Sequence, residues 1–344
     1  MPLTLPYRFA LAMFAEDGTS IGTVEAKRDW EAVYEWTRFY FQRRGQLSLD
    51  GDGAASVLPL WEETLGEPCC SGYRVQIEQA GREQVARAFS NEHFRDFANA
   101  LASIYVEQKK LREGEYYSYL LIAHPAPAQL ESHGSLRVSN ASPPVPARDA
   151  PLSAFLAASK ASGTICNGDM PVFVAARVLE ETAAQTRAHE GTETGGVLIG
   201  KLWRDPHAAE IFAEITAAIP AEHSIGSNVK LTFTPQTWSA ADAGLRLRNR
   251  GECFLGYYHS HPVRTWCKGR LCALEAQKSC RFAKDFFSAD DEAVMRAAFQ
   301  APWSIAIVAN DTAFTDLTFS MFGNREGFTQ TRGFYVLEDT LNGA

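Results

Sequence analysis

The sequence lacks the features of two large classes of protein, those that span membranes and those that bind nucleic acid through a basic surface. It contains no run of about 18 apolar residues, so we expect no membrane-spanning helix. Its net charge is -8, whereas a general nucleic-acid binder carries a basic face or stripe. The first residues, Met1 to Arg8, do not read as a secretory leader. We therefore expect a cytoplasmic protein with neither a membrane nor a nucleic acid as partner.

Cysteines are few and unevenly placed. The chain has seven of them, an odd number. Two are adjacent, two stand alone and three form a cluster, in the order Cys69, Cys70, Cys166, Cys253, Cys267, Cys272 and Cys280. Such a set, without a secretory leader, favours a reducing compartment with thiols free or bound to metal over a disulfide framework.

The composition is that of an ordinary globular protein large enough for two domains. The chain has 344 residues, of which 46% are hydrophobic and 22% are charged. Prolines gather among alanine, serine and glycine from residue 125 onward, in a stretch that can sustain neither a helix nor a central strand. We therefore expect an α+β recognition domain over 1–124, a proline-rich linker over 125–167 and a second domain over 168–344.

The first domain reads as a mixture of strands and helices. Turn residues at 16–19 predict a hairpin, and Asp29 precedes a helical segment over 30–43. Further elements are expected as strands around 72–77, 84–89 and 116–122, and as a helix capped by Ser90 or Asn91. This domain shows no catalytic motif, and we interpret Cys69 and Cys70 as buried, inert thiols.

In the second domain, strands and helices alternate without the even βαβ spacing of a doubly wound sheet, so α+β or a three-layer sandwich fits better. The expected strands are 172–174, 193–200, 211–219, 231–234, 254–258, 303–309 and 315–322. Helices are expected over 175–188, after Pro235 and after Ser288.

Two histidines close one of these strands. Side chains alternate along a strand, so His259 and His261 share a face and Ser260 takes the other. A His-x-His pair is a ready two-nitrogen chelate for a divalent metal, and neutral imidazole suits zinc. Alone, the pair could equally be an ordinary polar strand end.

Carboxylates upstream and downstream complete a candidate site. Asp291 opens the helix after Ser288 and can supply a third, anionic metal ligand. Glu193 lies at the mouth of a glycine-rich buried strand, where it can act as the base for metal-assisted amide hydrolysis. The alternatives are that Ser288 and Asp291 are an N-cap and a first-turn acid, that Glu193 lies in a surface loop, and that Glu190 is the base instead.

Three segments together resemble the signature of the JAMM (JAB/MPN) metalloprotease family. They are Glu193-x-Gly-Gly-Val-Leu-Ile-Gly, His259-Ser260-His261-Pro262 and Ser288-x-x-Asp291. The resemblance covers about residues 168–325. It implies a JAMM/MPN-like, cytidine deaminase-like α/β sandwich with a mixed sheet, and it does not extend to residues 1–150.

The resemblance also implies a role for each matched residue. His259, His261 and Asp291 would be the ligands of a catalytic zinc ion, and Glu193 would be the general base for the attacking water. Ser288 would donate a hydrogen bond to the developing oxyanion. Better-known members of the family cleave isopeptide bonds after the C-terminus of ubiquitin or ubiquitin-like proteins.

An insertion over 263–287 departs from the family pattern, in which the connection to the Ser-x-x-Asp segment is short. It holds Cys267, Cys272 and Cys280, which suggests a second, structural zinc site that staples the loop. The alternative is three unrelated thiols in a reduced loop. Since the insertion emerges between two expected zinc ligands, we predict that it flanks the active site and helps to position the substrate.

The sequence thus predicts a zinc isopeptidase or peptidase that matures a ubiquitin-like modifier or removes it from conjugates. The first domain would recognise the modifier, its target or a cognate conjugation enzyme. The alanine-rich character suggests a bacterial ubiquitin-like conjugation pathway, some of which act in antiphage defence. The alternatives are a peptidase that processes a sulfur-carrier precursor and a metal-free, non-catalytic scaffold of the same fold.

Overall fold

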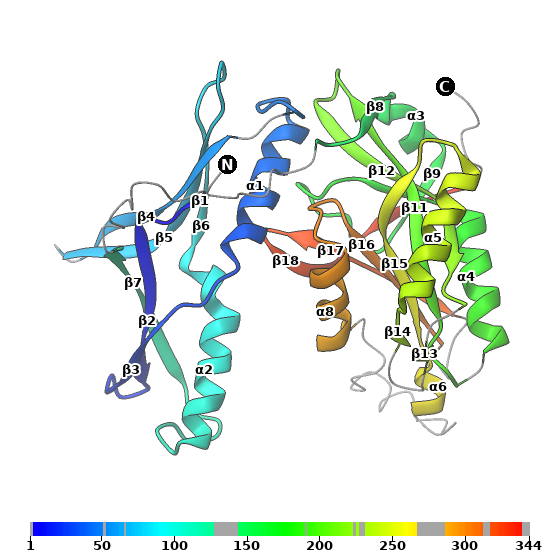
Figure 1. The fold of residues 1–344 in the computed structure, drawn as a ribbon. Coiled ribbons are helices and arrows are strands. Elements are labelled where there is room, and N and C mark those ends of the chain that lie inside the picture. Colours follow the sequence, from blue (N-terminus) through cyan, green and yellow to red (C-terminus); the bar gives the residue numbers. More distant parts are fainter. Residues whose placement is uncertain are drawn as a thin grey trace. The chain divides into compact units, whose positions relative to one another are not determined.

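The computed structural model describes residues 3–50, 53–64, 67–126, 144–189, 191–222, 225–226, 231–266, 286–311 and 317–338. The chain divides into two compact units, Met1–Gln42 with Gln46–Pro144 and Arg43–Gly45 with Val145–Ala344. Helices and sheets occur in both, so the α+β fold class is confirmed (Figure 1). Within the described residues, every helix is too short or too polar to cross a membrane.

The first unit is built on one largely antiparallel sheet with strand order β1-β4-β5-β7-β2-β3, and β6 pairs with β5. β1 and β4 run parallel, and the other pairings of this sheet that the structure describes are antiparallel. Its strands are β1 (Leu3–Thr4), β2 (Tyr7–Ala15), β3 (Ser20–Glu25), β4 (Ala54–Thr64), β5 (Glu67–Glu78), β6 (Val85–Ser90) and β7 (Tyr117–Pro125). Its helices are α1 (Trp30–Arg43), a 3-10 turn at Asn91–Phe94 and α2 (Arg95–Glu107).

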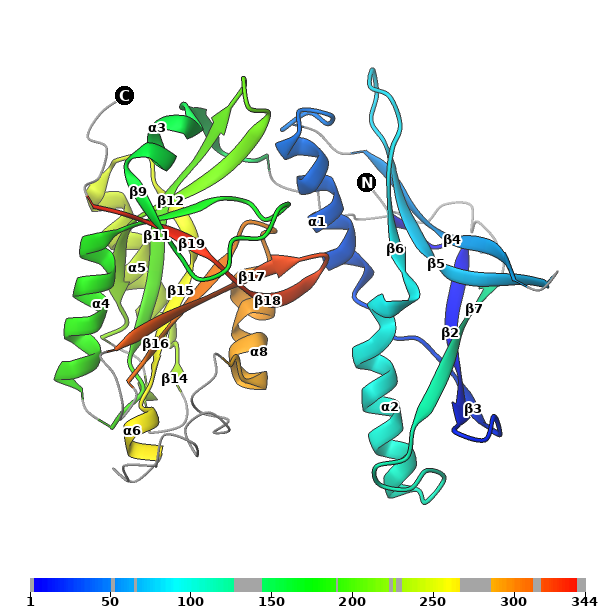
Figure 2. The same ribbon diagram turned by 180° about the vertical axis from the view of Figure 1, so that it is seen from behind.

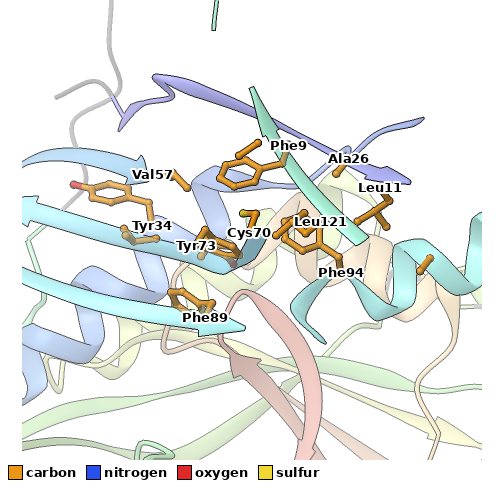
Figure 3. Close-up of a cluster of buried hydrophobic side chains, with 14 of the residues drawn as sticks. Phe9, Leu11, Ala26, Tyr34, Val57, Cys70, Tyr73, Phe89, Phe94 and Leu121 are labelled. Atoms are coloured by element: carbon orange, nitrogen blue, oxygen red, sulfur yellow. The ribbon is translucent and has the colours of Figure 1, made fainter. Parts of the chain in front are cut away.

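Buried aromatic rings join the sheet of this unit to its helices (Figure 3). Tyr73 from β5 lies face to face with Phe89 from β6, their ring centroids 5.0 Å apart. The same tyrosine meets Phe94, at the start of α2, edge-on at 5.7 Å. Fully burying such a ring contributes about 1.5–3 kcal/mol, so these contacts form the centre of the core.

The hairpin at 16–19 and the helix over 30–43 are confirmed, but β4 was not predicted. Pro59 lies inside this strand, and a proline in the sequence disfavours the prediction of a strand because it has no backbone N–H to donate to a neighbouring strand. In the structure β1 pairs only with Ala55 and Ser56 of β4. Within the described residues, Pro59 therefore has a partner strand on one side only, where a missing N–H is tolerated.

The second unit contains a mixed sheet of order β18-β17-β16-β15-β11-β12-β10-β19-β9, with β8 beside β11. Its strands are β8 (Ala147–Asp149), β9 (Ser159–Ser162), β10 (Val172–Ala175), β11 (Gly195–Asp205), β12 (Glu210–Pro220), β15 (Cys253–His261), β16 (Ile305–Asn310), β17 (Thr318–Arg325), β18 (Phe328–Arg332) and β19 (Phe334–Leu337). A separate pair is β13 (Ile225–Gly226) with β14 (Leu231–Thr232). The helices are α3 (Leu152–Ala157), α4 (Ala176–Ala188), α5 (Pro235–Arg248), α6 (Val263–Trp266) and α8 (Ala289–Ala298).

Helices cover both faces of the central strands. On β15, the side chain of Tyr258 reaches α4, where its hydroxyl donates to Gln185. The neighbouring Tyr257 faces the other way and packs with α5 and α8, its ring 5.5 Å from that of Phe299. Figures 1 and 2 show α4 and α5 on opposite sides of the sheet. The central strands β11 and β15 are therefore buried from both sides.

The linker predicted over 125–167 is wrong for residues 147–162, which form β8, α3 and β9 of the second unit. Ala147 pairs in parallel register with Leu202 of β11, and Phe155 of α3 packs on Phe212 at 4.8 Å. The prolines do not prevent this, because Pro151 stands at the N-cap of α3, outside its hydrogen-bonded turns. Residues 127–143 of the predicted linker lie outside the described residues.

Glu214 is a carboxylate buried within β12, with only 4% of its surface exposed. It accepts a hydrogen bond from Nε1 of Trp203 at 2.9 Å. Burial raises the pKa of Glu214, and the Trp203 hydrogen bond opposes this rise. The folded state therefore holds the proton to a higher pH than the unfolded state does, and the stability linked to this proton is lost as pH rises through the folded pKa.

We expect Glu214→Gln to stabilise the protein at mildly alkaline pH, because glutamine keeps an acceptor for Trp203 and removes the buried charge. The difference in Tm between variant and wild type should shrink as the pH falls below the ordinary pKa of glutamate, where Glu214 is protonated in both states. Each kcal/mol relieved raises Tm by about 2–4 °C for a unit of this size. Thermal unfolding measured at mildly alkaline pH and at a pH below the ordinary pKa of glutamate checks this, with exposed Glu180→Gln as control. A Tm difference between Glu214→Gln and wild type that does not change with pH would contradict it.

Candidate metal centre

His259 and His261 lie at the end of β15, between β11 and β16. His259 pairs with Gly195 on one side and with Val308 on the other. Both histidines are buried, and their Nε2 atoms converge to 3.0 Å. The Nδ1 atoms of both rings are buried and find no hydrogen-bond partner among the described residues. The Nε2 atoms of the two rings are thus directed at one point.

Asp291 brings a carboxylate to the same point. Its Oδ1 lies 3.1 Å from Nε2 of His259, and its Oδ2 lies 3.7 Å from Nε2 of His261. Burial would raise the pKa of Asp291, but hydrogen bonds from the two histidines and from the backbone of Ser288 hold it well below its ordinary value. The carboxylate is therefore ionised at neutral pH.

These three side chains fit a zinc ion by their chemistry. Their ligand atoms lie within 4.8 Å of one another, and among the described residues no other set of three metal-ligating groups meets this criterion. Two imidazole nitrogens and one carboxylate oxygen are ligands that zinc accepts, and three protein ligands leave a position for water. Burial also lowers the pKa of His261, which keeps the ring neutral and able to bind a metal.

Ser288 and Asp291 form a capping box at the start of α8. The hydroxyl oxygen of Ser288 accepts from the backbone N–H of Asp291 at 3.1 Å, and the N–H of Ser288 donates to Oδ2 of Asp291 at 2.7 Å. The N-cap interpretation and the metal-ligand interpretation therefore describe the same residues. The box fixes Asp291 towards the histidines and leaves the hydroxyl hydrogen of Ser288 free to donate elsewhere.

Glu193 lies two residues before β11 and is 7% exposed. Two hydrogen bonds attach its neighbour Thr194 to the histidine strand: the N–H of Thr194 donates to Oγ of Ser260 at 2.9 Å, and the N–H of Ser260 donates to the carbonyl of Thr194 at 2.8 Å. The sequence alone indicates no role for Ser260. The alternation of side chains that pairs His259 with His261 sends its hydroxyl towards this loop.

Burial raises the pKa of Glu193 to about 7; the charge of His259 opposes the rise, and those of Asp291 and Asp290 add to it. A carboxylate with a pKa near neutrality can both accept and return a proton. Among the described residues it makes no hydrogen bond or ion pair. The competing Glu190 lies outside the described residues.

Aromatic rings enclose the histidines on the side of the insertion. Phe286 stacks on His261 with centroids 4.4 Å apart, and Trp266 lies 5.2 Å from the same ring. These two residues stand at the two ends of the predicted insertion, whose Cys267, Cys272 and Cys280 lie outside the described residues. Neither ring can be assigned to the site from sequence, because nothing local to Phe286 links it to a histidine 25 positions earlier.

Residues 175–264 match the family model described as prokaryotic homologs of the JAB domain. The chain contains a JAB-like domain. The match includes Glu193, His259 and His261 and ends before Ser288 and Asp291. JAB domains include metallopeptidases and non-catalytic members.

Two further comparisons accompany this match. No curated protein sequence matches the chain. A solution structure of a protein from Desulfitobacterium hafniense is 17% identical, with 49% of this chain and 94% of that chain covered and a TM-score of 0.32.

We expect the JAB-like domain to bind zinc at this centre, and His259→Ala to lose one zinc ion per chain relative to wild type. Two ligands that remain hold zinc far less tightly than three. Elemental analysis after dialysis measures the loss, and the exposed His207→Ala serves as control. Equal zinc content in His259→Ala and wild type would show that zinc binds elsewhere.

Proposed function

We propose that the JAB-like domain is a zinc-dependent peptidase or isopeptidase that cuts after the C-terminus of a ubiquitin-like modifier, either in a precursor or in a conjugate. One observation supports hydrolysis most strongly: a buried, unpaired carboxylate, Glu193, beside three converging metal-ligand side chains. The ubiquitin-like substrate is proposed from the resemblance to the JAMM signature.

The proposed chemistry divides among the residues of the centre. Zinc, when bound by His259, His261 and Asp291, supplies a Lewis acid that activates water and polarises the scissile carbonyl. Glu193, with its pKa near 7, accepts the proton of the attacking water and returns it to the leaving amine. Ser288 donates its free hydroxyl hydrogen to the developing oxyanion, a contact worth about 3 kcal/mol in comparable sites.

The wider setting is also proposed. The first unit would bind the modifier, its target or a conjugation enzyme, and the pathway would be a cytoplasmic, bacterial ubiquitin-like conjugation system, one setting of which is antiphage defence. The insertion, whose ends Trp266 and Phe286 pack on His261, would help to hold the substrate at the metal.

We expect Glu193→Gln to lose at least about a hundredfold in kcat against a modifier fusion, because the amide cannot exchange a proton with water. The variant should keep its zinc, since Glu193 is not one of the three converging ligands. Hydrolysis of a modifier with a short C-terminal extension, compared with a lysine-linked conjugate, measures activity and separates precursor processing from deconjugation. Glu180→Gln on the exposed face of α4 is the matched control.

Each outcome of this experiment bears on the proposal. Full activity in Glu193→Gln would contradict the assignment of the base. Wild type that carries no zinc at the histidines and cuts neither substrate would favour the scaffold. Cleavage of the extended precursor alone would favour the processing of a sulfur carrier.

A further inference from the structure

A cavity of about 700 Å³ lies beside Glu193, on the opposite face of the sheet from the histidines. One wall is the face of α4 that carries Glu181 and Gln185, with His189 at the C-cap of this helix, and the ring of Tyr258 lines the cavity as well. The end of β12 and the turn after it supply Pro220 and Glu222. The domain therefore has a second concave surface that is continuous with the proposed base.

The ionisable side chains that line this cavity are mostly acidic, with His189 as the exception; Arg177 and Arg248 approach Glu181 from outside the lining. Three carboxylates line it, those of Glu181, Glu193 and Glu222, and the described lining residues include no lysine or arginine. Glu181 has a distant partner in Arg177, 3.9 Å away on the exposed side of α4. Glu193 is nine-tenths buried and, like Glu222, has no ion pair within the described residues. A buried carboxylate takes up either a proton or a cation, and each offsets the cost of its burial.

A metal ion does not fit these carboxylates. Within the described part of the chain, only His259, His261 and Asp291 bring three ligand atoms within 4.8 Å of one another. The acidic groups of the cavity are more widely spread. They suit an extended organic cation, which can contact carboxylates that lie too far apart to bind one metal ion.

The remaining lining matches the stem of such a cation. Ala218, Pro220 and Ala221 and the ring of Tyr258 provide apolar surface between the acidic groups. Lysine and arginine lay their aliphatic stems along apolar surface while the charged head meets polar partners. The cavity, with apolar walls and carboxylates around them, is therefore complementary in polarity and charge to a lysine or arginine side chain.

The cavity also lies within reach of the bond that the proposed function would cut. Gly195 pairs with His259, so the start of β11 and the end of β15 meet at one edge of the sheet. At that edge His259 faces the metal centre and Tyr258 faces the cavity, because neighbouring side chains alternate. Glu193 contributes to both. A chain held at the metal can therefore place a side chain a few residues away in the cavity.

We propose that this cavity is a specificity subsite that receives a lysine or arginine side chain of the polypeptide substrate, within a few residues of the scissile bond. The proposal rests on the proposed function, since it assumes that a polypeptide is held at the metal centre. It adds the substrate class: chains with a basic residue near the cut are preferred over neutral ones.

The test uses quenched fluorescent peptides in which one arginine, or norleucine as a neutral side chain, is placed in turn at each position around the scissile bond. At one position, zinc-loaded wild type should cut the arginine peptide on the order of fivefold faster in kcat/KM, the size of a partly screened charge contact. In the double variant Glu181→Gln, Glu222→Gln this ratio should fall towards one. Both residues are exposed at the surface, and Glu180→Gln, one position away on α4, should keep the ratio.

The outcomes separate this proposal from the proposed function. If wild type cuts the peptides with no preference for arginine, or the double variant keeps the preference, the subsite is wrong and the peptidase stands. If nothing is cut, the binding of the same labelled peptides is measured by fluorescence anisotropy. Tighter binding of an arginine peptide by wild type, lost in the double variant, then supports the subsite without the peptidase; equal binding overturns it.

Discussion

The candidate centre depends on one pairing register, that of β11 against β15. Gly195 pairs with His259, and the hydrogen bonds between Thr194 and Ser260 hold the loop of Glu193 beside it. A slip of one residue would turn the histidines to the α4 face. Gly196 permits β11 to approach both neighbouring strands closely, since a Cβ there would lie 2.6 Å from the ring of Tyr258 in β15 and 2.2 Å from the carbonyl oxygen of Ile219 in β12. Backbone pairing, more than any side-chain contact, sets the distance between base and metal ligands.

The start of α8 serves stability and function together. Its capping box stabilises the helix by satisfying two backbone N–H groups, and the same Asp291 completes the set of metal ligands. Removing the carboxylate of Asp291 would therefore destabilise the first turn of α8 and also remove one of the three metal ligands. Tyr257 adds a further tie, because its hydroxyl donates to the backbone carbonyl of Asp291 at 3.0 Å.

Local patterns predicted the elements of the site well and their surroundings poorly. The period of two in β15 and the cap before α8 can be read from neighbouring residues, and both bring their residues together as expected. Pro59 argued against β4 in sequence, and the prolines near Pro151 argued against β8 and α3. Proline destabilises a strand or helix only where its missing N–H would have made a hydrogen bond, and this depends on the tertiary structure. The stacking of Phe286 on His261 and the acidic cavity depend on tertiary contacts that no local pattern contains.

In the proposed centre, His259, His261 and Asp291 bind one zinc ion while Glu193 stays uncoordinated and moves protons. Anomalous diffraction from crystals of the zinc-loaded protein, recorded on both sides of the zinc absorption edge, tests it most directly. We expect one strong peak bounded by two imidazole nitrogens and the carboxylate of Asp291, with Glu193 near the metal without coordinating it. No peak between these residues, or a peak coordinated by Glu193, would contradict it.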